Sequence, residues 1–155
     1  MQKKTAIAFV TLLITSGLTF QAHALDCRQV ERLGNALKER ILSDIRGHSE
    51  GLERELTKRK TLHIHSIDDL RFDGCKAIID ATVEMERKVR RDAHGNARIV
   101  GKIGVGSLSG DELCFKSAPK IERLKLSNTT RLGEGVYKWL GNTIWPLDRC
   151  YPVNL

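Results

Sequence analysis

The sequence lacks the short motifs that usually mark a catalytic centre. It contains no GxSxG, no HExxH and no CxxC spacing, so nothing supports a serine-hydrolase elbow, a zinc-protease helix, a redox dithiol or a zinc ribbon. The stretch GKIGVGSLSG at 101–110 is rich in glycine, but no predicted helix begins after it, as a phosphate-binding loop requires. We therefore expect a non-enzymatic protein that uses no cofactor.

Long apolar runs are also missing, except near the start of the chain. Two lysines, Lys3 and Lys4, precede a mostly apolar stretch at 6–20, and AHA at 22–24 fits a small-x-small cleavage site. The stretch is short and is interrupted by Thr and Ser, which disfavours a membrane span. The pattern predicts a Sec-type signal peptide cleaved after Ala24. We expect a periplasmic or secreted product, with 25–155 forming a single domain.

Acidic residues are in the minority. The chain has 26 Lys and Arg against 19 Asp and Glu, a net charge of +7. The predicted signal peptide removes two lysines and no acid, so the product stays basic and favours anionic partners. For an exported protein, we expect an anionic lipid or membrane surface, or an acidic protein partner, and no nucleic acid.

Residues 26–46 have the pattern of an amphipathic helix. Asp26 can cap the first turn, and Gln29 stands at the reciprocal position of a capping box. Apolar residues recur along one face, and Gly47 is typical of a left-handed C-terminal stop. The charged stretch that follows, 48–60, is interpreted as a linker or a short helix.

From residue 61 onward the apolar period changes to two. Alternation over 61–73 and 75–89 predicts strands with one apolar face. A three-residue loop at 93–95, with Gly95 left-handed, is a favoured hairpin turn to the next strand, and the glycines beyond it predict bends in a curved sheet. A further strand is predicted at 121–126, and a helix that ends before Pro146. The hairpin register pairs Val89 with Ile99, Met85 with Ile103 and Val83 with Val105.

Basic residues gather near this predicted turn. Their charge can form a surface that binds anions, or it can protect a sheet edge and keep the protein in solution. Glu84 and Glu86, on the polar face of the same hairpin, are predicted to form cross-strand ion pairs rather than an acid–base pair. The predicted anion-binding residues are Arg87, Lys88, Arg90, Arg91, Arg98 and Lys102.

Two histidines, His63 and His65, lie on one face of the strand at 61–73. Two imidazoles on one face can bind zinc or copper, with Asp69 and His48 as possible neighbours. The sequence specifies no third ligand, and an exposed polar face accounts for the same pattern. We predict no metal site and retain the two histidines as the candidates for one.

The order of these elements resembles the tubular lipid-binding (TULIP) architecture. An amphipathic helix and long amphipathic antiparallel strands are followed by a strand, KIERLKLSN, and a helix, LGEGVYKWLGNTIW. The resemblance implies lipid binding between a helix and a bent sheet, whereas a cystatin-like helix-on-sheet fold explains the same pattern. Trp145 can line such a groove or pack in the core. The predicted groove residues are Leu37, Ile41, Val83, Met85, Ile103, Val105 and Trp139.

The four cysteines, at 27, 75, 114 and 150, predict two disulfides in an oxidising compartment and allow three pairings. In the derived register Cys75 faces Leu113, so one bulge would bring it beside Cys114. We favour Cys75–Cys114 with Cys27–Cys150. The main alternative is Cys27–Cys75 with Cys114–Cys150, which would attach the first helix to the strands.

These patterns predict an α+β fold. A long N-terminal helix packs on a curved antiparallel sheet of four to five strands, with a C-terminal helix and two disulfides. The leading functional hypothesis is a binding protein for an amphipathic anionic ligand or surface, such as lipid. The alternative is a protein–protein module, such as a periplasmic inhibitor or immunity protein, that uses its basic hairpin. A continuous apolar cavity would favour the first, and a filled core with an exposed hairpin the second.

Overall fold

A computed structural model describes residues 26–106, 112–116, 118–127, 132–146 and 149–153. The predicted signal peptide, 1–24, lies outside the described residues. The described part of the chain forms two helices and seven strands. In chain order they are α1 (Cys27–Ser49), β1 (Glu53–Thr57), β2 (Lys60–Asp73), β3 (Lys76–Arg87), β4 (Ala93–Val105), β5 (Glu112–Phe115), β6 (Lys120–Leu126), α2 (Glu134–Ile144) and β7 (Cys150–Pro152).

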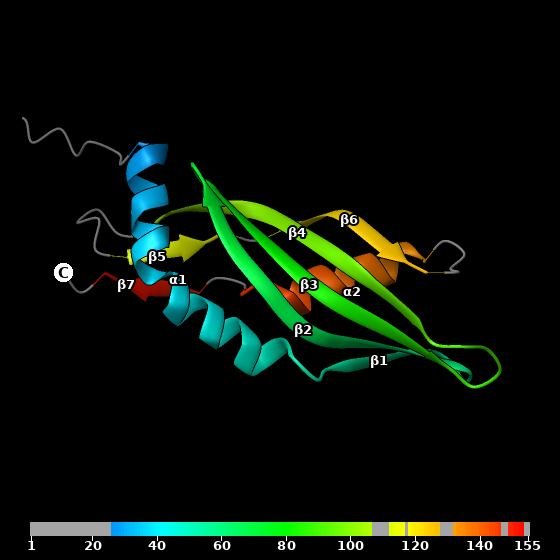
Figure 1. The fold of residues 1–155 in the computed structure, drawn as a ribbon. Coiled ribbons are helices and arrows are strands. Elements are labelled where there is room, and N and C mark those ends of the chain that lie inside the picture. Colours follow the sequence, from blue (N-terminus) through cyan, green and yellow to red (C-terminus); the bar gives the residue numbers. More distant parts are fainter. Residues whose placement is uncertain (1–25, 107–111, 117, 128–131, 147–148, 154–155) are drawn as a thin grey trace, which may run out of the picture.

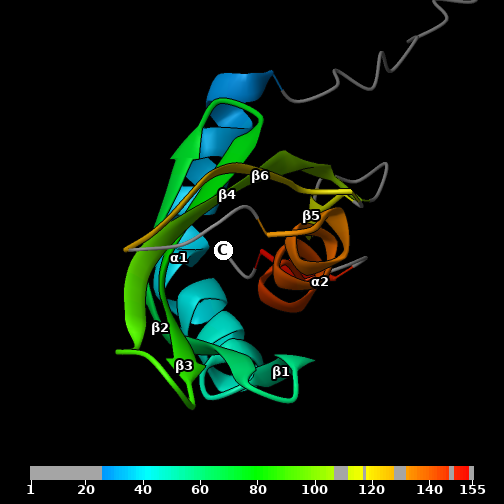
Figure 2. The ribbon, with the colours of Figure 1, turned by 90° about the vertical axis from the view of Figure 1, so that its right-hand side faces the viewer.

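The strands form one curled antiparallel sheet. Its order is β1-β2-β3-β4-β5-β7, and β6 also pairs with β4. The long strands β2, β3 and β4 run from the region of α1 to a narrow far end beside β1 (Figure 1). The sheet curves around α1 and α2 (Figure 2). The predicted α+β class is therefore confirmed, but the sheet has more strands than expected, because β1, β5 and β7 were not predicted.

The first helix begins where its sequence predicts. The Gln29 N–H donates to the Asp26 carboxylate at 2.8 Å, and the Asp26 N–H donates to the Gln29 side chain at 3.0 Å, which completes the capping box. The predicted stop at Gly47 is wrong, since the helix continues to Ser49. The buried Ser49 hydroxyl donates to the Thr143 carbonyl at 3.0 Å. This contact with α2 explains why the last turn stays helical.

Strand β2 is a single strand of 14 residues with two irregularities in its pairing to β3. Ile64 pairs with Val83 and Ser66 pairs with Thr82, so His65 is the extra residue of a bulge. A bulge reverses the side-chain alternation that follows it. Ile64 and Ile67 can therefore both be buried although three positions separate them.

The predicted register between β3 and β4 is wrong. Met85 pairs with Ala93, and Ile79 pairs with Ile99. The connecting loop is 88–92, so Val89 lies in the loop with 74% of its surface exposed instead of facing the core. The pairing differs from the predicted one by an even number of residues, and an even shift leaves each side chain on the same face of the sheet. The alternate apolar residues of β3 that were predicted to face the core are consequently buried, namely Ala77, Ile79, Ala81, Val83 and Met85.

Gly95 serves a different purpose from the predicted turn. It lies within β4, opposite Leu126 of β6. A β-carbon at this position would overlap the Lys125 carbonyl oxygen. Glycine is therefore needed at this position because β6 approaches the backbone of β4 closely. Gly95 does not have the positive φ that the predicted hairpin turn required.

The favoured disulfide pairing is also wrong, and the alternative is the one observed: Cys27–Cys75 and Cys114–Cys150. The reason is that β4 lies between the two cysteines that we expected to pair. Cys75 meets β4 from the β3 side, where its carbonyl accepts the Ile103 N–H, whereas Cys114 pairs with Gly104 from the β5 side. Cys75 is instead held at the start of α1, and Cys114 faces Cys150 across β5 and β7. Two disulfides indicate an oxidising environment, such as the periplasm or the cell exterior.

One hydrophobic cluster fills the space between the sheet and both helices. Trp145, at the end of α2, is 1% exposed and packs its ring edge-to-face on Phe115 at 4.9 Å between centroids. Its indole N–H donates to the Lys116 carbonyl at 2.7 Å. The ring lies against Gly101, where a β-carbon would come within 2.6 Å of it. These contacts place Trp145 firmly in the core.

Candidate functional site: a basic tip formed by two hairpins

Two hairpin turns meet at one end of the sheet. The β1–β2 turn is closed where Thr57 pairs with Lys60. Lys60 in turn pairs with Arg87 at the end of β3, and the Lys88 N–H donates to the Arg59 carbonyl at 3.1 Å. The turn at 57–60 and the segment 87–92, which is the last residue of β3 and the loop after it, are thus joined by backbone contacts, although about thirty residues separate them in the chain.

We call residues 57–60 and 87–92 the basic tip. Seven of these ten residues are basic and one, Asp92, is acidic. Asp92 accepts the Arg87 N–H at 3.0 Å and so closes the loop. The basic side chains of the tip lie close together at the surface, so their positive charges repel one another and attract anions. The exposed basic residues of the tip are Lys58, Arg59, Lys60, Lys88, Arg90 and Arg91.

Two of the predicted anion-binding residues do not belong to the tip. Arg98 pairs with Asp80 near the middle of β4, and Lys102 pairs with Lys76 at the opposite end of the strands. Arg98 and Lys102 were predicted to lie near the turn because the loop was predicted at 93–95, whereas it lies at 88–92. The predicted residues Arg87, Lys88, Arg90 and Arg91 do come together.

The tip also contains basic residues that sequence reasoning missed. Lys58, Arg59 and Lys60 were assigned to a charged linker or short helix, but they form the β1–β2 turn. The signal in the sequence was weak, because the five residues of β1, ERELT, include a single apolar residue, Leu56, and show no apolar alternation. The strand pattern of β2 follows directly after the polar turn residues.

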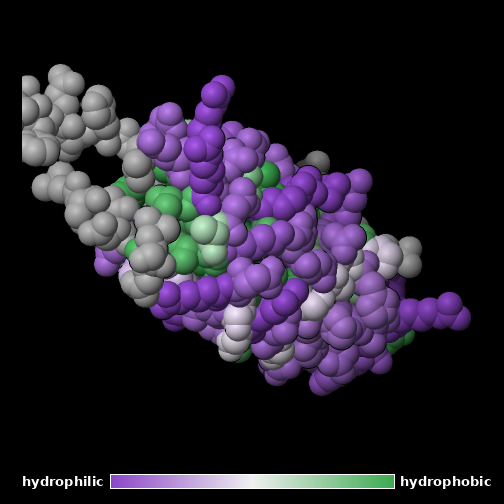
Figure 3. Space-filling model, turned by 60° about the vertical axis from the view of Figure 1, so that its left-hand side comes forward, coloured by the Kyte–Doolittle hydropathy of each residue, from purple (hydrophilic) through white to green (hydrophobic). Residues whose placement is uncertain are grey.

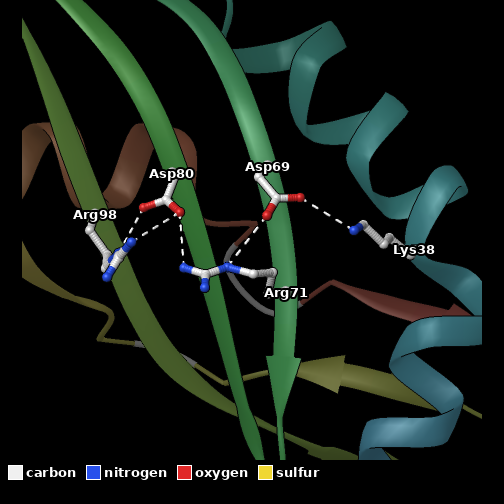
Figure 4. A network of polar contacts seen from close by, with 5 residues as sticks. All are labelled: Lys38, Asp69, Arg71, Asp80 and Arg98. Atoms are coloured by element: carbon white, nitrogen blue, oxygen red, sulfur yellow. Dashed lines mark hydrogen bonds and ion pairs between the residues drawn. The ribbon is translucent and has the colours of Figure 1, made fainter.

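Arg98 takes part in a network of ion pairs across the sheet instead (Figure 4). Its guanidinium donates to Asp80 at 2.8 Å, and Asp80 also contacts Arg71 at 3.0 Å. Burial disfavours the charged form of Asp80, but the hydrogen bonds and charges of Arg98 and Arg71 outweigh it and lower the pKa of that carboxyl. Asp69 extends the network from Arg71 to Lys38 on α1. Arg98 is therefore already engaged by a carboxylate.

An open polar hollow of about 310 Å³ lies on β2 and β3 beside the tip and contains both candidate histidines. His63 bridges three strands, with one ring nitrogen 3.3 Å from Glu53 and the other 3.2 Å from Glu86. The predicted neighbours are elsewhere, since Asp69 contacts Lys38 and His48 bonds to the Asp44 carbonyl. The hollow is lined by Gly51, His63, Ile64, His65, Glu84, Glu86 and Asp92.

Within the described residues, three potential metal-ligand atoms come together at Glu112, Cys114 and Cys150. The two cysteine sulfurs are joined in a disulfide, and a metal-binding cysteine must be a thiolate. This group is therefore not a metal centre. His63 and His65 do not form such a group with a third ligand among the described residues.

The predicted groove residues are members of the hydrophobic cluster or pack against it. Leu37, Val105 and Trp139 are partly buried, and the Arg54 guanidinium lies 5.9 Å from the Trp139 ring. The hollow beside the tip contains none of the seven predicted residues. The face in Figure 3 is mainly hydrophilic, with hydrophobic residues visible over a limited area. The fully buried members are Ile41, Val83, Met85 and Ile103.

A second polar cluster anchors the end of the chain to α1. The Tyr151 hydroxyl donates to the Asp44 carboxylate at 2.5 Å, and Arg149 donates to it at 2.8 Å. The hydrogen bond from Tyr151, together with the hydrogen bond and charge of Arg149, lowers the pKa of Asp44, although burial opposes the shift. Burial and the bond to Asp44 raise the pKa of Tyr151. The cluster holds β7 in place with Asp44 ionised and Tyr151 neutral.

This cluster predicts a pH effect on stability. Because the pKa of Asp44 is lower in the folded state, its ionised form stabilises the fold above about pH 4, and this contribution is lost as the pH falls through the folded pKa. Replacing Tyr151 with Phe is expected to lower the free energy of unfolding by about 1 kcal/mol at neutral pH, because Asp44 is partly exposed. The stability lost between about pH 5 and pH 2 should also become smaller.

Denaturant titrations over this pH range measure both effects. The matched control is the Asp44→Asn variant, which lacks the carboxylate. The double variant Asp44→Asn/Tyr151→Phe should show the same pH dependence of the free energy of unfolding as Asp44→Asn alone. Equal acid sensitivity of the Tyr151→Phe variant and the unaltered protein would contradict the prediction.

Comparisons with protein-family models, curated proteins and solved structures found no match for this chain. The resemblance to the tubular lipid-binding architecture stays a prediction. Among the described residues, no helix combines the length and apolar character that a membrane span requires.

Proposed function

We propose that this chain is a non-enzymatic exported protein that binds anionic surfaces or partners through its basic tip. The observation that carries the proposal is the meeting of two turns, one at 57–60 and one at 87–92, which gathers seven basic residues and one acidic residue. Export through the predicted signal peptide is part of the proposal, and the two disulfides are compatible with it.

The geometry of the tip suits electrostatic binding. Its two turns are connected through backbone atoms and through the Asp92 carboxylate, so the charges are arranged before a partner arrives. Preorganisation reduces the entropy lost on binding. Each basic residue close to an anionic bilayer contributes about 1 kcal/mol, so several together can hold a protein at a surface.

A second candidate function is a protein–protein module, such as an inhibitor or immunity protein. The observation that favours it is the combination of one hydrophobic core cluster with an exposed hairpin end. In this case the tip would meet acidic side chains on a protein. Both candidates use the same residues, and they differ in the class of partner.

The test of the proposed function is binding to an immobilised polyanion, dextran sulfate. The variant Lys58→Gln/Arg59→Gln/Lys60→Gln should bind about 10- to 100-fold more weakly at low salt, because three contributions of about 1 kcal/mol are removed and partly screened. The difference should shrink as salt is added. These three side chains are exposed, so folding should be retained, which circular dichroism can check.

The matched control removes the same charge from the other end of the strands. Lys76, Lys102 and Lys116 are exposed there; Lys76 pairs with Lys102, and the Lys116 N–H donates to the Lys102 carbonyl. The variant Lys76→Gln/Lys102→Gln/Lys116→Gln should keep most of the binding. Equal losses in both variants would show that net charge, and not the tip, governs binding.

A further inference from the structure

The basic tip has an exposed apolar residue in its loop. Val89 lies in the loop 88–92 and is 74% exposed, against 44% for Leu52 and 37% for Tyr137, the other exposed large hydrophobic residues of the described chain. Lys88 and Arg90 flank it directly. A single exposed apolar side chain is ordinary on a protein surface. Its place between the basic residues of the tip is what suggests a role.

The size of the tip argues for a particular class of partner. The two turns offer ten residues, 57–60 and 87–92, whereas a standard protein interface uses about 20 to 30 residues on each side. Figure 1 shows that these turns lie at the narrow end of the long strands. A lipid bilayer needs no surface of matching shape, because its headgroups adapt to the protein. A small, strongly charged end suits a bilayer better than a second protein.

We infer that the basic tip docks on a bilayer rich in anionic lipid, with its Lys and Arg side chains at the headgroup phosphates and Val89 entering the boundary between headgroups and acyl chains. The inference rests on the proposed function and adds the partner class and the role of Val89. Surface charge and buried apolar area act together in proteins that bind this boundary. In this inference the lipid is a surface that the tip contacts, and the hydrophobic cluster of the core takes no part in binding.

The backbone around Val89 supports this orientation. The Asp92 carboxylate accepts the Arg87 N–H, and the Lys88 N–H donates to the Arg59 carbonyl in the β1–β2 turn, so hydrogen bonds hold the loop on both sides of Val89. The Val89 side chain is already exposed in this arrangement. The charges and the apolar contact should respond differently to salt, because salt screens charges and leaves apolar burial in place.

The test is co-sedimentation of the mature, disulfide-bonded protein with vesicles of phosphatidylcholine alone or mixed with phosphatidylglycerol. We expect binding to the mixed vesicles and little to phosphatidylcholine alone. Val89→Ser should weaken binding about fivefold at every salt concentration, which corresponds to about 1 kcal/mol of apolar burial. Val89→Phe should strengthen binding. Leu52→Ser, a change at an exposed apolar residue outside the tip, should have no effect.

The outcomes separate this inference from the proposed function. In one outcome the variant Lys58→Gln/Arg59→Gln/Lys60→Gln binds dextran sulfate more weakly, but the unaltered protein does not bind the mixed vesicles. The tip then binds another anion, such as an acidic protein, and only the membrane inference is overturned. If Val89→Ser binds the mixed vesicles as well as the unaltered protein does, the role of Val89 is overturned. If the variant Lys58→Gln/Arg59→Gln/Lys60→Gln binds both dextran sulfate and the mixed vesicles as well as the unaltered protein does, both proposals are overturned.

Discussion

Replacing Trp145 with Ala is expected to lower the free energy of unfolding by about 3 to 5 kcal/mol. The side chain is 1% exposed, packs on Phe115 and donates its indole N–H to the Lys116 carbonyl. Its loss would leave a cavity opposite Gly101, whose missing side chain gives the ring its space. A domain of this size is usually stable by about 5 to 15 kcal/mol, so the change removes a large part of the total.

Trp139 provides the matched control for this prediction. It lies within α2, which ends at the residue before Trp145, but its ring is partly exposed and the Arg54 guanidinium lies over it. Trp139→Ala should therefore cost clearly less than Trp145→Ala. Urea denaturation followed by circular dichroism measures both variants. Equal costs would mean that the core is not organised around Trp145 as described.

Each of the two disulfides is expected to contribute about 4 kcal/mol in the chain-entropy model. The bonds span 48 residues (Cys27–Cys75) and 36 residues (Cys114–Cys150), and the entropy of closing a loop changes slowly with its length. The double variants Cys27→Ser/Cys75→Ser and Cys114→Ser/Cys150→Ser should therefore lose similar amounts. Denaturation with and without reductant gives the sum of both contributions.

Peptide mapping without reduction tests the pairing itself. Cleavage at Lys and Arg residues between the cysteines should release one linked pair that contains Cys27 and Cys75, and another that contains Cys114 and Cys150. A peptide joining Cys75 to Cys114 would contradict the sheet order, because β4 separates these two residues.

The position of the tip relative to the core has a consequence for function. The buried apolar residues of the sheet and of both helices belong to one hydrophobic cluster. Charge is concentrated at the far end of the strands, away from Trp145 and the disulfide of Cys114. Changes in the tip should thus alter binding while leaving stability nearly unchanged.

Parts of the candidate site could be read from the sequence, and others could not. The basic residues Arg87, Lys88, Arg90 and Arg91 were predicted near a turn because they lie between the strand alternation over 75–89 and the predicted loop at 93–95. Arg98 was assigned to the same site because a loop at 93–95 with Gly95 left-handed was predicted, although Gly95 is required by the close approach of β6. The turn at 57–60 was missed because its strand, β1, has only one apolar residue, Leu56, that packs against the core.

The features that depend on neighbouring residues could be predicted from the amino-acid sequence. The capping box at Asp26 defines the start of α1, and the alternation along β3 defines which side chains face the core. These signals are local, since a cap and its partner are three residues apart and a strand alternates with a period of two.

Only the tertiary structure decided the features that depend on distant residues. A hairpin can shift by an even number of residues without moving a side chain to the other face, so alternation did not specify which residues of β3 and β4 pair. The bulge at His65, the backbone contact of β6 at Gly95 and the position of β4 between Cys75 and Cys114 all involve separate elements. For the same reason the basic tip exists only in the folded chain, where two turns far apart in sequence become neighbours.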